Sequence, residues 1–235
     1  MLSESLGSWK IDVEEYKMTI SGMSLGKRLT LSFALVITLM ALLAGLAYVR
    51  IGDLNGEFDL IIKDRYPKTA VANNIKAQIN EISRSMLGIM IMSDPGQIKA
   101  ELDAIEKFSI ANSESIATLD KIITDEKGRE LLTAITEIRN RFLPLQQSFV
   151  SLVSKDLKDE AQLKYLFSMR PLQKKYFDAL DAFVAHQNGQ MESAGDNSSQ
   201  IARQTKLLIL ALAVAAAVAC AVVGFLVTRS IVRPL

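Results

Sequence analysis

Two long uncharged stretches constrain the fold of this chain more than any other feature of its sequence. Residues 29–49 (LTLSFALVITLMALLAGLAYV) and 207–228 (LLILALAVAAAVACAVVGFLVT) contain no charged side chain. About 20 apolar residues are enough for a helix to cross a bilayer. We therefore expect two transmembrane helices, separated by residues 50–206.

The flanks of these spans indicate how the chain is oriented. Lys27 and Arg28 precede the first span, and Arg229 and Arg233 follow the second. Positive residues in short flanks favour the cytoplasm, whereas long loops translocate largely regardless of charge. We expect both termini in the cytoplasm, as segments 1–28 and 229–235, and residues 50–206 outside.

We expect the first span to remain in the protein as an uncleaved membrane anchor, because its apolar run is too long for the core of a signal peptide. The residues before it are less typical of a membrane protein, since DVEEYK forms an acidic cluster within residues 1–22. Met23 begins the more natural start MSLGKRL, which suggests an upstream extension. Small residues recur in both spans, and they fit either close helix contact in lipid or Ala-rich helices that face lipid.

Between the spans, apolar residues recur at helical spacing. Steps of three and four residues give two seams typical of helices that pack together. The first seam is Ala72, Ile75, Ile79, Ile82, Met86 and Ile89, and the second is Leu132, Ile135, Ile138, Phe142, Leu145, Phe149 and Leu152. A third set is Leu166, Tyr176, Leu180 and Phe183, and a looser one is Ile98, Leu102, Ile105, Leu119 and Ile122.

Breaks between these seams predict where helices end. The breaks are SDPGQ, TDEKG and SKDLKDE, and the last two mix acidic and turn-forming residues that fit helix starts. We expect four helices, at residues 50–93, 96–123, 127–154 and 160–205. The predicted fold is all-α: an antiparallel up-and-down four-helix bundle flanked by two transmembrane helices continuous with its first and last helices.

Several classes of function lack support in the composition. The chain has one histidine, His186, one cysteine, Cys220, and a net charge of +1, so we expect no metal site, no cofactor and no nucleic-acid partner. It has no phosphate-cradling glycine loop and no HExxH motif. We expect no enzymatic activity in this chain.

The order of these parts resembles the front half of a bacterial methyl-accepting chemotaxis receptor. DRYPK at residues 64–68 and SMRPLQKKYFDAL at residues 168–180 resemble the first and last helices of its four-helix-bundle sensor class, and SIVRPL at the end resembles the start of a HAMP linker. The resemblance implies a homodimer in the inner membrane with residues 50–206 as a periplasmic ligand-binding domain. Kinase and coupling protein would contact only the cytoplasmic part that would follow.

Arg84 interrupts the apolar stretch ISRSMLGIMIM, nearly opposite the first seam. Its own face of the helix carries small, polar or mixed residues and would suit a second copy of the chain: Tyr66, Asn73, Ala77, Gly88 and Ile91. An arginine there can bind a carboxylate through two hydrogen bonds. A surface arginine paired with Glu81 is an equally good interpretation.

The resemblance also implies ligand contacts. In aspartate-sensing relatives, three arginines of this helix meet the ligand, and ISRSM matches the middle one at Arg84. Gly88 stands in the position of the third, and Gln78 or Ile79 in that of the first, so aspartate or serine sensing is not implied.

Arg170 is the second candidate, because it precedes Pro171 and the proline cannot bond to the Phe167 carbonyl. Tyr165 and Gln173 are nearby helpers. An ordinary exposed arginine is the alternative interpretation of Arg170. At Pro67, a kink is the expected consequence.

The predicted function is therefore a chemoreceptor sensing module that binds a small organic anion, such as an amino acid or a carboxylic acid. The same bundle would also fit a sensor histidine kinase or a diguanylate cyclase, or a membrane-anchored bundle that binds a partner protein and no ligand. The sequence leaves open the identity of the ligand and whether a binding protein delivers it.

Overall fold

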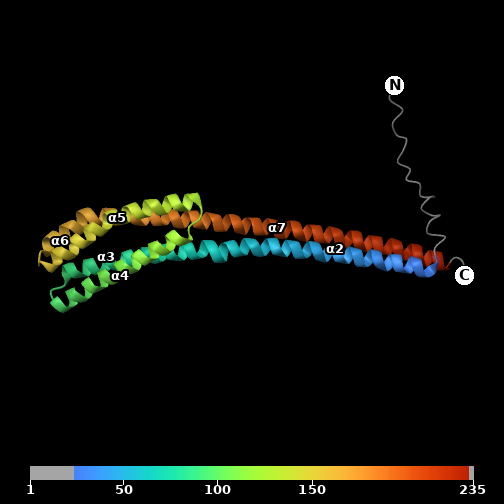
Figure 1. The fold of residues 1–235 in the computed structure, drawn as a ribbon, viewed down its shortest axis with the longest axis horizontal. Coiled ribbons are helices and arrows are strands. Elements are labelled where there is room, and N and C mark those ends of the chain that lie inside the picture. Colours follow the sequence, from blue (N-terminus) through green and yellow to red (C-terminus); the bar gives the residue numbers. More distant parts are fainter. Residues whose placement is uncertain (1–23, 233–235) are drawn as a thin grey trace, which may run out of the picture. The chain divides into compact units, whose positions relative to one another are not determined.

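The computed structural model describes residues 24–232, and helices account for nearly all of them (Figure 1). Their bounds are α2 Leu25–Asp59, η1 Leu60–Arg65, α3 Tyr66–Ile91, α4 Pro95–Ile122, α5 Glu126–Ser154, α6 Lys158–Lys164, η2 Tyr165–Met169 and α7 Arg170–Val232. The described residues contain no strand. The predicted all-α fold class is confirmed.

The chain divides into two units, which we describe separately. The first comprises Met1–Asn55 and Ser199–Leu235, and the second Gly56–Ser198. Both α2 and α7 contribute residues to each unit, because their bounds cross the division.

The inner helices of the second unit begin at aspartates. The Asp94 carboxylate accepts a hydrogen bond from the Gln97 N–H at 2.8 Å, before α4. Asp125 accepts one from the Gly128 N–H at 2.7 Å, before α5. Such caps satisfy backbone donors that have no partner within the helix. The predicted helices at 96–123 and 127–154 agree with α4 and α5 to within a single residue at each end.

The outer helices contain π-helical turns that the sequence did not predict. In η1 the last N–H, from Tyr66, donates to the Ile61 carbonyl, and in η2 the Arg170 N–H donates to the Tyr165 carbonyl. Each turn ends two residues before a proline, because η1 ends at Arg65 before Pro67 and η2 ends at Met169 before Pro171. A proline ring clashes with the carbonyl four residues earlier, and the wider π turn relieves this clash. The expected uninterrupted helix from residue 160 onward is corrected accordingly.

The core of the second unit consists of two apolar clusters. One joins α3, α4, α5 and α7 through residues such as Ile79, Leu119, Ile135 and Phe183. The other joins the opposite halves of the same helices, together with α6 and η2. All six residues of the first predicted seam are buried. Each cluster therefore draws on α3, α4, α5 and α7.

One residue that was predicted to lie in the core is exposed at the surface. Leu166 is 36 % exposed, whereas its neighbours Tyr165 and Met169 are buried. The π turn adds a residue to this part of the helix and rotates the face that meets the core. The predicted position of Leu166 in the third seam is wrong for this reason.

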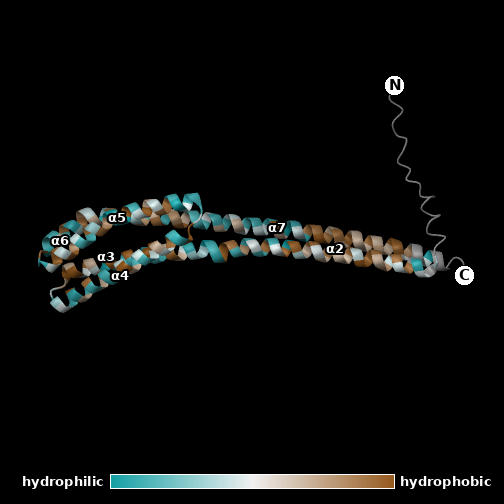
Figure 2. Cartoon of the chain, viewed as in Figure 1, coloured by the Kyte–Doolittle hydropathy of each residue, from teal (hydrophilic) through white to brown (hydrophobic). Residues whose placement is uncertain are grey.

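The described part of the first unit has an apolar surface. Figure 2 shows hydrophobic residues along α2 and along the last part of α7, and side chains such as Phe33, Leu42 and Val218 are exposed. Two described helices are long and apolar enough to cross a membrane, judged by length and composition. Residues of both helices, Phe33 and Cys220 among them, line a cleft of ≈ 240 Å³ within this unit.

Candidate functional site

Arg84 lies on α3 with most of its side chain exposed. Its Nε and Nη2 atoms lie 2.8 and 2.7 Å from Glu81 Oε2, one helical turn earlier. The hydrogen bond to Glu81 raises the pKa of Arg84, and Glu101 adds negative charge nearby. Of the two interpretations of Arg84, the structure shows the ion pair with Glu81. A ligand carboxylate would have to compete with Glu81 for the guanidinium.

Arg170 and Tyr165 come together at η2. Tyr165 is buried, and its ring packs edge-on against Phe149 with centroids 6.5 Å apart. Burial raises the pKa of Tyr165, while nearby Ser83 and the positive charge of Arg170 act in the opposite direction. Arg170 itself is exposed. Tyr165 therefore lies near Ser83 on α3 and near Arg170 at the start of α7.

The remaining predicted ligand contacts lie in different surroundings. Phe167 is 75 % exposed, and Gln173 is half-buried on α7. Gln78 faces α4, because its Nε2 donates to the Ser115 hydroxyl at 3.0 Å. The structure therefore brings Tyr165 and Arg170 together and places Gln78 in a separate contact between α3 and α4.

The predicted dimer face is largely open within one chain. Tyr66, Asn73 and Ala77 are exposed, and Ile91 is 86 % exposed. Gly88 is half-buried, and a Cβ there would lie 3.4 Å from the Met92 methyl group. These residues stay a prediction for a contact with a second copy.

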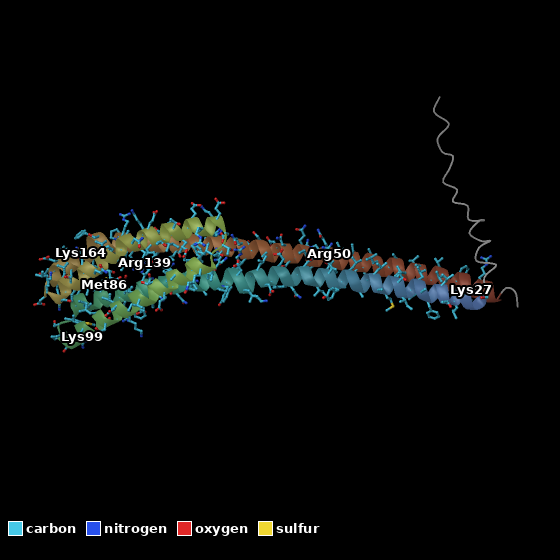
Figure 3. All side chains as sticks on the ribbon, viewed as in Figure 1. Lys27, Arg50, Met86, Lys99, Arg139 and Lys164 are labelled. Carbon is cyan, nitrogen blue, oxygen red and sulfur yellow. The ribbon has the colours of Figure 1, made fainter. Side chains whose placement is uncertain are left out.

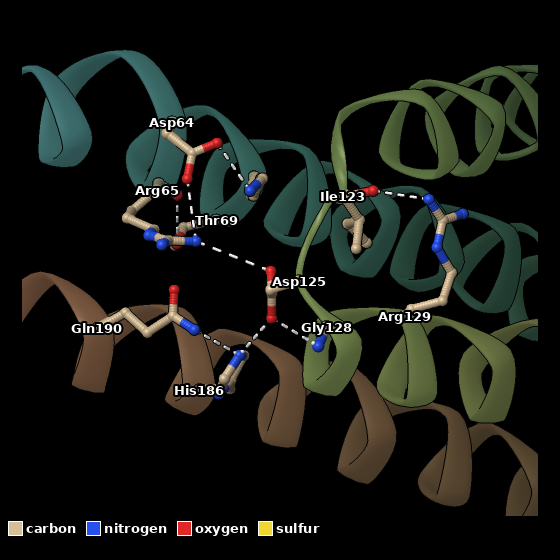
Figure 4. A network of polar contacts seen from close by, with 10 residues as sticks. Asp64, Arg65, Thr69, Ile123, Asp125, Gly128, Arg129, His186 and Gln190 are labelled. Atoms are coloured by element: carbon tan, nitrogen blue, oxygen red, sulfur yellow. Dashed lines mark hydrogen bonds and ion pairs between the residues drawn. The ribbon is translucent and has the colours of Figure 1, made fainter.

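A polar network joins three helices at one end of the second unit (Figure 4). Asp125, the cap of α5, is 2.9 Å from His186 Nε2 on α7 and 3.8 Å from Arg65 Nη1. Gln190 places its amide nitrogen 2.8 Å from the same His186 nitrogen. Burial alone would raise the pKa of Asp125, but the bonds from His186 and the Gly128 N–H outweigh it, so the pKa of Asp125 is lowered.

A buried lysine lies next to this network. The side chain of Lys68 is 1 % exposed, and its Nζ lies 2.8 Å from Asp64 Oδ1 across the junction of η1 and α3. Asp64 also pairs with its neighbour Arg65 at 2.9 Å. Removing a buried charge from water is costly unless the charge is paired. The ion pair with Asp64 thus offsets part of the free-energy cost of burying the Lys68 charge.

Sequence reasoning missed this network, although one signal was present. TDEKG marked a helix start, which is where Asp125 acts. The contact with His186 joins residues that lie far apart in the chain, and no spacing rule predicts such a pair. Among residues 24–232, no group of three or more His, Cys, Asp or Glu side chains could hold a metal ion.

The comparison with protein families agrees with this architecture. A family described as a four helix bundle sensory module for signal transduction matches residues 22–202. That match covers more than half of the chain and includes α3, α4, α5 and α6 entirely. No curated protein sequence matches the chain. The chain belongs to the family of four-helix-bundle sensory modules for signal transduction found in chemotaxis receptors.

Proposed function

We propose that this chain is the sensing part of a chemoreceptor, which binds a small organic anion outside the cytoplasmic membrane and signals inward. The observation that carries the proposal is the family match across residues 22–202, which is a sensory module for signal transduction. The predicted HAMP linker after the second span would connect the sensor to a cytoplasmic output domain.

The two apolar helices support a two-pass arrangement in the bacterial inner membrane. Their large apolar side chains are exposed in the chain alone, and a bilayer would cover them. Both termini would lie in the cytoplasm, with residues 50–206 in the periplasm. This topology follows from the basic flanks and the length of the intervening segment.

The second unit would work as an antiparallel up-and-down bundle. One apolar cluster joins early residues of α3 and α5 with late residues of α4 and with residues 176–183 of α7. The other joins later residues of α3 and α5 with Ile105 of α4 and with α6, η2 and the start of α7. That order is what alternating helix directions produce. Because α7 contributes to both units, a small shift of this helix would carry a signal toward the membrane.

The predicted ligand contacts form the first site to test. Arg170 has no carboxylate within ion-pair distance among the described residues, and it lies beside Tyr165. Arg84 would contribute after exchanging Glu81 for the ligand. The exposed face with Tyr66, Asn73 and Ala77 would pair with a second copy, which would complete the site across the dimer.

Thermal unfolding of the full chain in lipid nanodiscs tests this proposal. Amino acids, dicarboxylates, tricarboxylates and aromatic acids are screened, because binding to the folded state raises the melting temperature. We expect a shift with one acid class that Arg170→Gln abolishes. Lys175→Gln, at an exposed position of the same helix, is the matched control. A chain that responds to no acid would contradict direct sensing of an anion.

A further inference from the structure

A groove on the second unit lies between α4 and α5, and neither Arg84 nor Arg170 lines it. It has a volume of ≈ 580 Å³ and is lined by residues from the second half of α4 and the first half of α5. Sites for small molecules commonly have volumes of several hundred Å³. Apolar side chains form part of its wall, including Ile116, Ala117 and Leu132.

Arg139 enters this groove with a guanidinium that is only partly satisfied (Figure 3 marks the residue). Nη2 donates to the Ser113 hydroxyl, whereas Nε is buried and has no hydrogen-bond partner among the described residues. No carboxylate of the described chain lies within ion-pair distance of Arg139. A half-buried guanidinium without an acidic partner is available to bind a carboxylate through two hydrogen bonds.

A proline places a backbone acceptor beside this arginine. Pro144 lies inside α5 and has no N–H, so the Asn140 carbonyl cannot receive the usual helical bond from residue 144. Asn140 also lines the groove. A carbonyl that lacks its helical partner can accept a hydrogen bond from a ligand cation.

The groove is lined by equal numbers of acidic and basic side chains. Arg129 already binds Asp120, and its second nitrogen donates to the Ile123 carbonyl at 2.6 Å. Glu137 is exposed at the groove and forms no ion pair with the described residues. One free cation and one free acid favour a ligand that carries both signs over a dianion.

From this geometry we propose that the α4–α5 groove binds a zwitterionic amino acid with a small apolar side chain. Arg139 would hold the carboxylate, and the Asn140 carbonyl with Glu137 would hold the ammonium group. The inference deepens the proposed function by naming a ligand class and a pocket distinct from Arg84 and Arg170. It rests on the proposed function only for the claim that binding is a signal.

A buried polar layer would connect this groove to α7. Beside Ser113, Asn112 donates to the Ile75 carbonyl at 3.4 Å and accepts from the Tyr176 hydroxyl at 3.3 Å. The charge of Arg139 also reaches Tyr176. Residues of α3, α4, α5 and α7 thus meet within this layer, and a movement of Arg139 toward a ligand would change the surroundings of Tyr176.

Isothermal titration calorimetry on the full chain in nanodiscs tests the groove. The probes are glycine, L-alanine, L-valine and L-leucine, with propionate and succinate as ligands that lack the ammonium group. We expect an amino acid to bind, and Arg139→Gln to raise its Kd at least ~10-fold. Arg141→Gln, an exposed arginine of the same helix outside the groove, should leave Kd unchanged.

Pro144→Ala separates loss of binding from loss of folding. It restores the N–H that the Asn140 carbonyl lacks, so the helix gains stability while the ligand loses its acceptor. We expect Kd to rise ~5-fold or more, which is about the effect of one lost hydrogen bond. An unchanged Kd in Pro144→Ala overturns the ammonium contact.

Three results overturn the inference as a whole: no probe amino acid binds, succinate binds more tightly than the amino acids, or Arg139→Gln leaves Kd unchanged. If binding is lost in Arg170→Gln but retained in Arg139→Gln, the sensor proposal stands and the groove assignment fails. The opposite pattern supports the groove.

Discussion

Replacing Asp125 should show how much the polar network stabilises the second unit. Asp125→Ala removes the helix cap on the Gly128 N–H, which is worth about 1 kcal/mol. It also removes the 2.9 Å contact with His186, a partly buried hydrogen bond worth about 1 kcal/mol more. We therefore expect Asp125→Ala to lower the free energy of unfolding by about 2 kcal/mol.

Asp125→Asn separates these two contributions. Asparagine caps a helix as well as aspartate does, but it removes the negative charge beside His186. The expected loss is about 1 kcal/mol, half of that for alanine. Urea unfolding of the full chain in dodecylmaltoside micelles, followed by circular dichroism, measures both variants. Equal losses for Asn and Ala would refute the capping role, and no loss for either would refute the network.

The contribution of Asp125 to the free energy of unfolding should depend on pH. The folded-state pKa of Asp125 is lower than its ordinary value of 3.8. Its contribution is therefore present above that value and is lost as the pH falls through the lowered folded-state pKa. The difference between wild type and Asp125→Ala should stay constant near neutral pH and shrink below about pH 4. A difference that already shrinks well above pH 4 would contradict the assignment of this effect to Asp125.

Three further predictions follow from local geometry. A Cβ on Gly128 would meet the Asp125 carboxylate oxygens at 2.8 Å, so Gly128→Ala should displace the cap and cancel the usual gain of about 1 kcal/mol from replacing a helical glycine, as urea unfolding would show. Asp64→Asn leaves Lys68 buried without its acid and should cost about 2 kcal/mol or more; adding Lys68→Met should recover most of this loss in the same assay. In a cysteine-free background, Ala77→Cys should form an intermolecular disulfide in membranes, and Ala134→Cys, at an exposed alanine of α5, should not; equal crosslinking on non-reducing gels would contradict the dimer face.

Features that depend on local spacing were predictable from the sequence. The seam from Ala72 to Ile89 is buried because its steps follow one face of a helix. Asp125 was detectable as a helix start for the same local reason. The predicted helix ends of α4 and α5 are therefore accurate.

Features that depend on contacts between distant residues were not predictable. Pro67 and Pro171 signalled an irregularity, but a π turn is only one of the ways in which a helix accommodates a proline. The π turn η2 turns Tyr165 inward and leaves Leu166 exposed. Arg139 follows the apolar Ile138 in sequence, and only the approach of α4 gives it a groove and the Ser113 hydroxyl.

The central claim is that this chain turns ligand binding into a signal across a membrane. The most direct test joins residues 1–235 to the HAMP and cytoplasmic part of a chemotaxis receptor and measures the activity of the associated kinase in membranes. We predict that an acid identified by the unfolding screen changes kinase activity, and that the variant that abolishes binding also abolishes this change. A hybrid that assembles with the kinase but gives constant activity at saturating ligand would contradict the account.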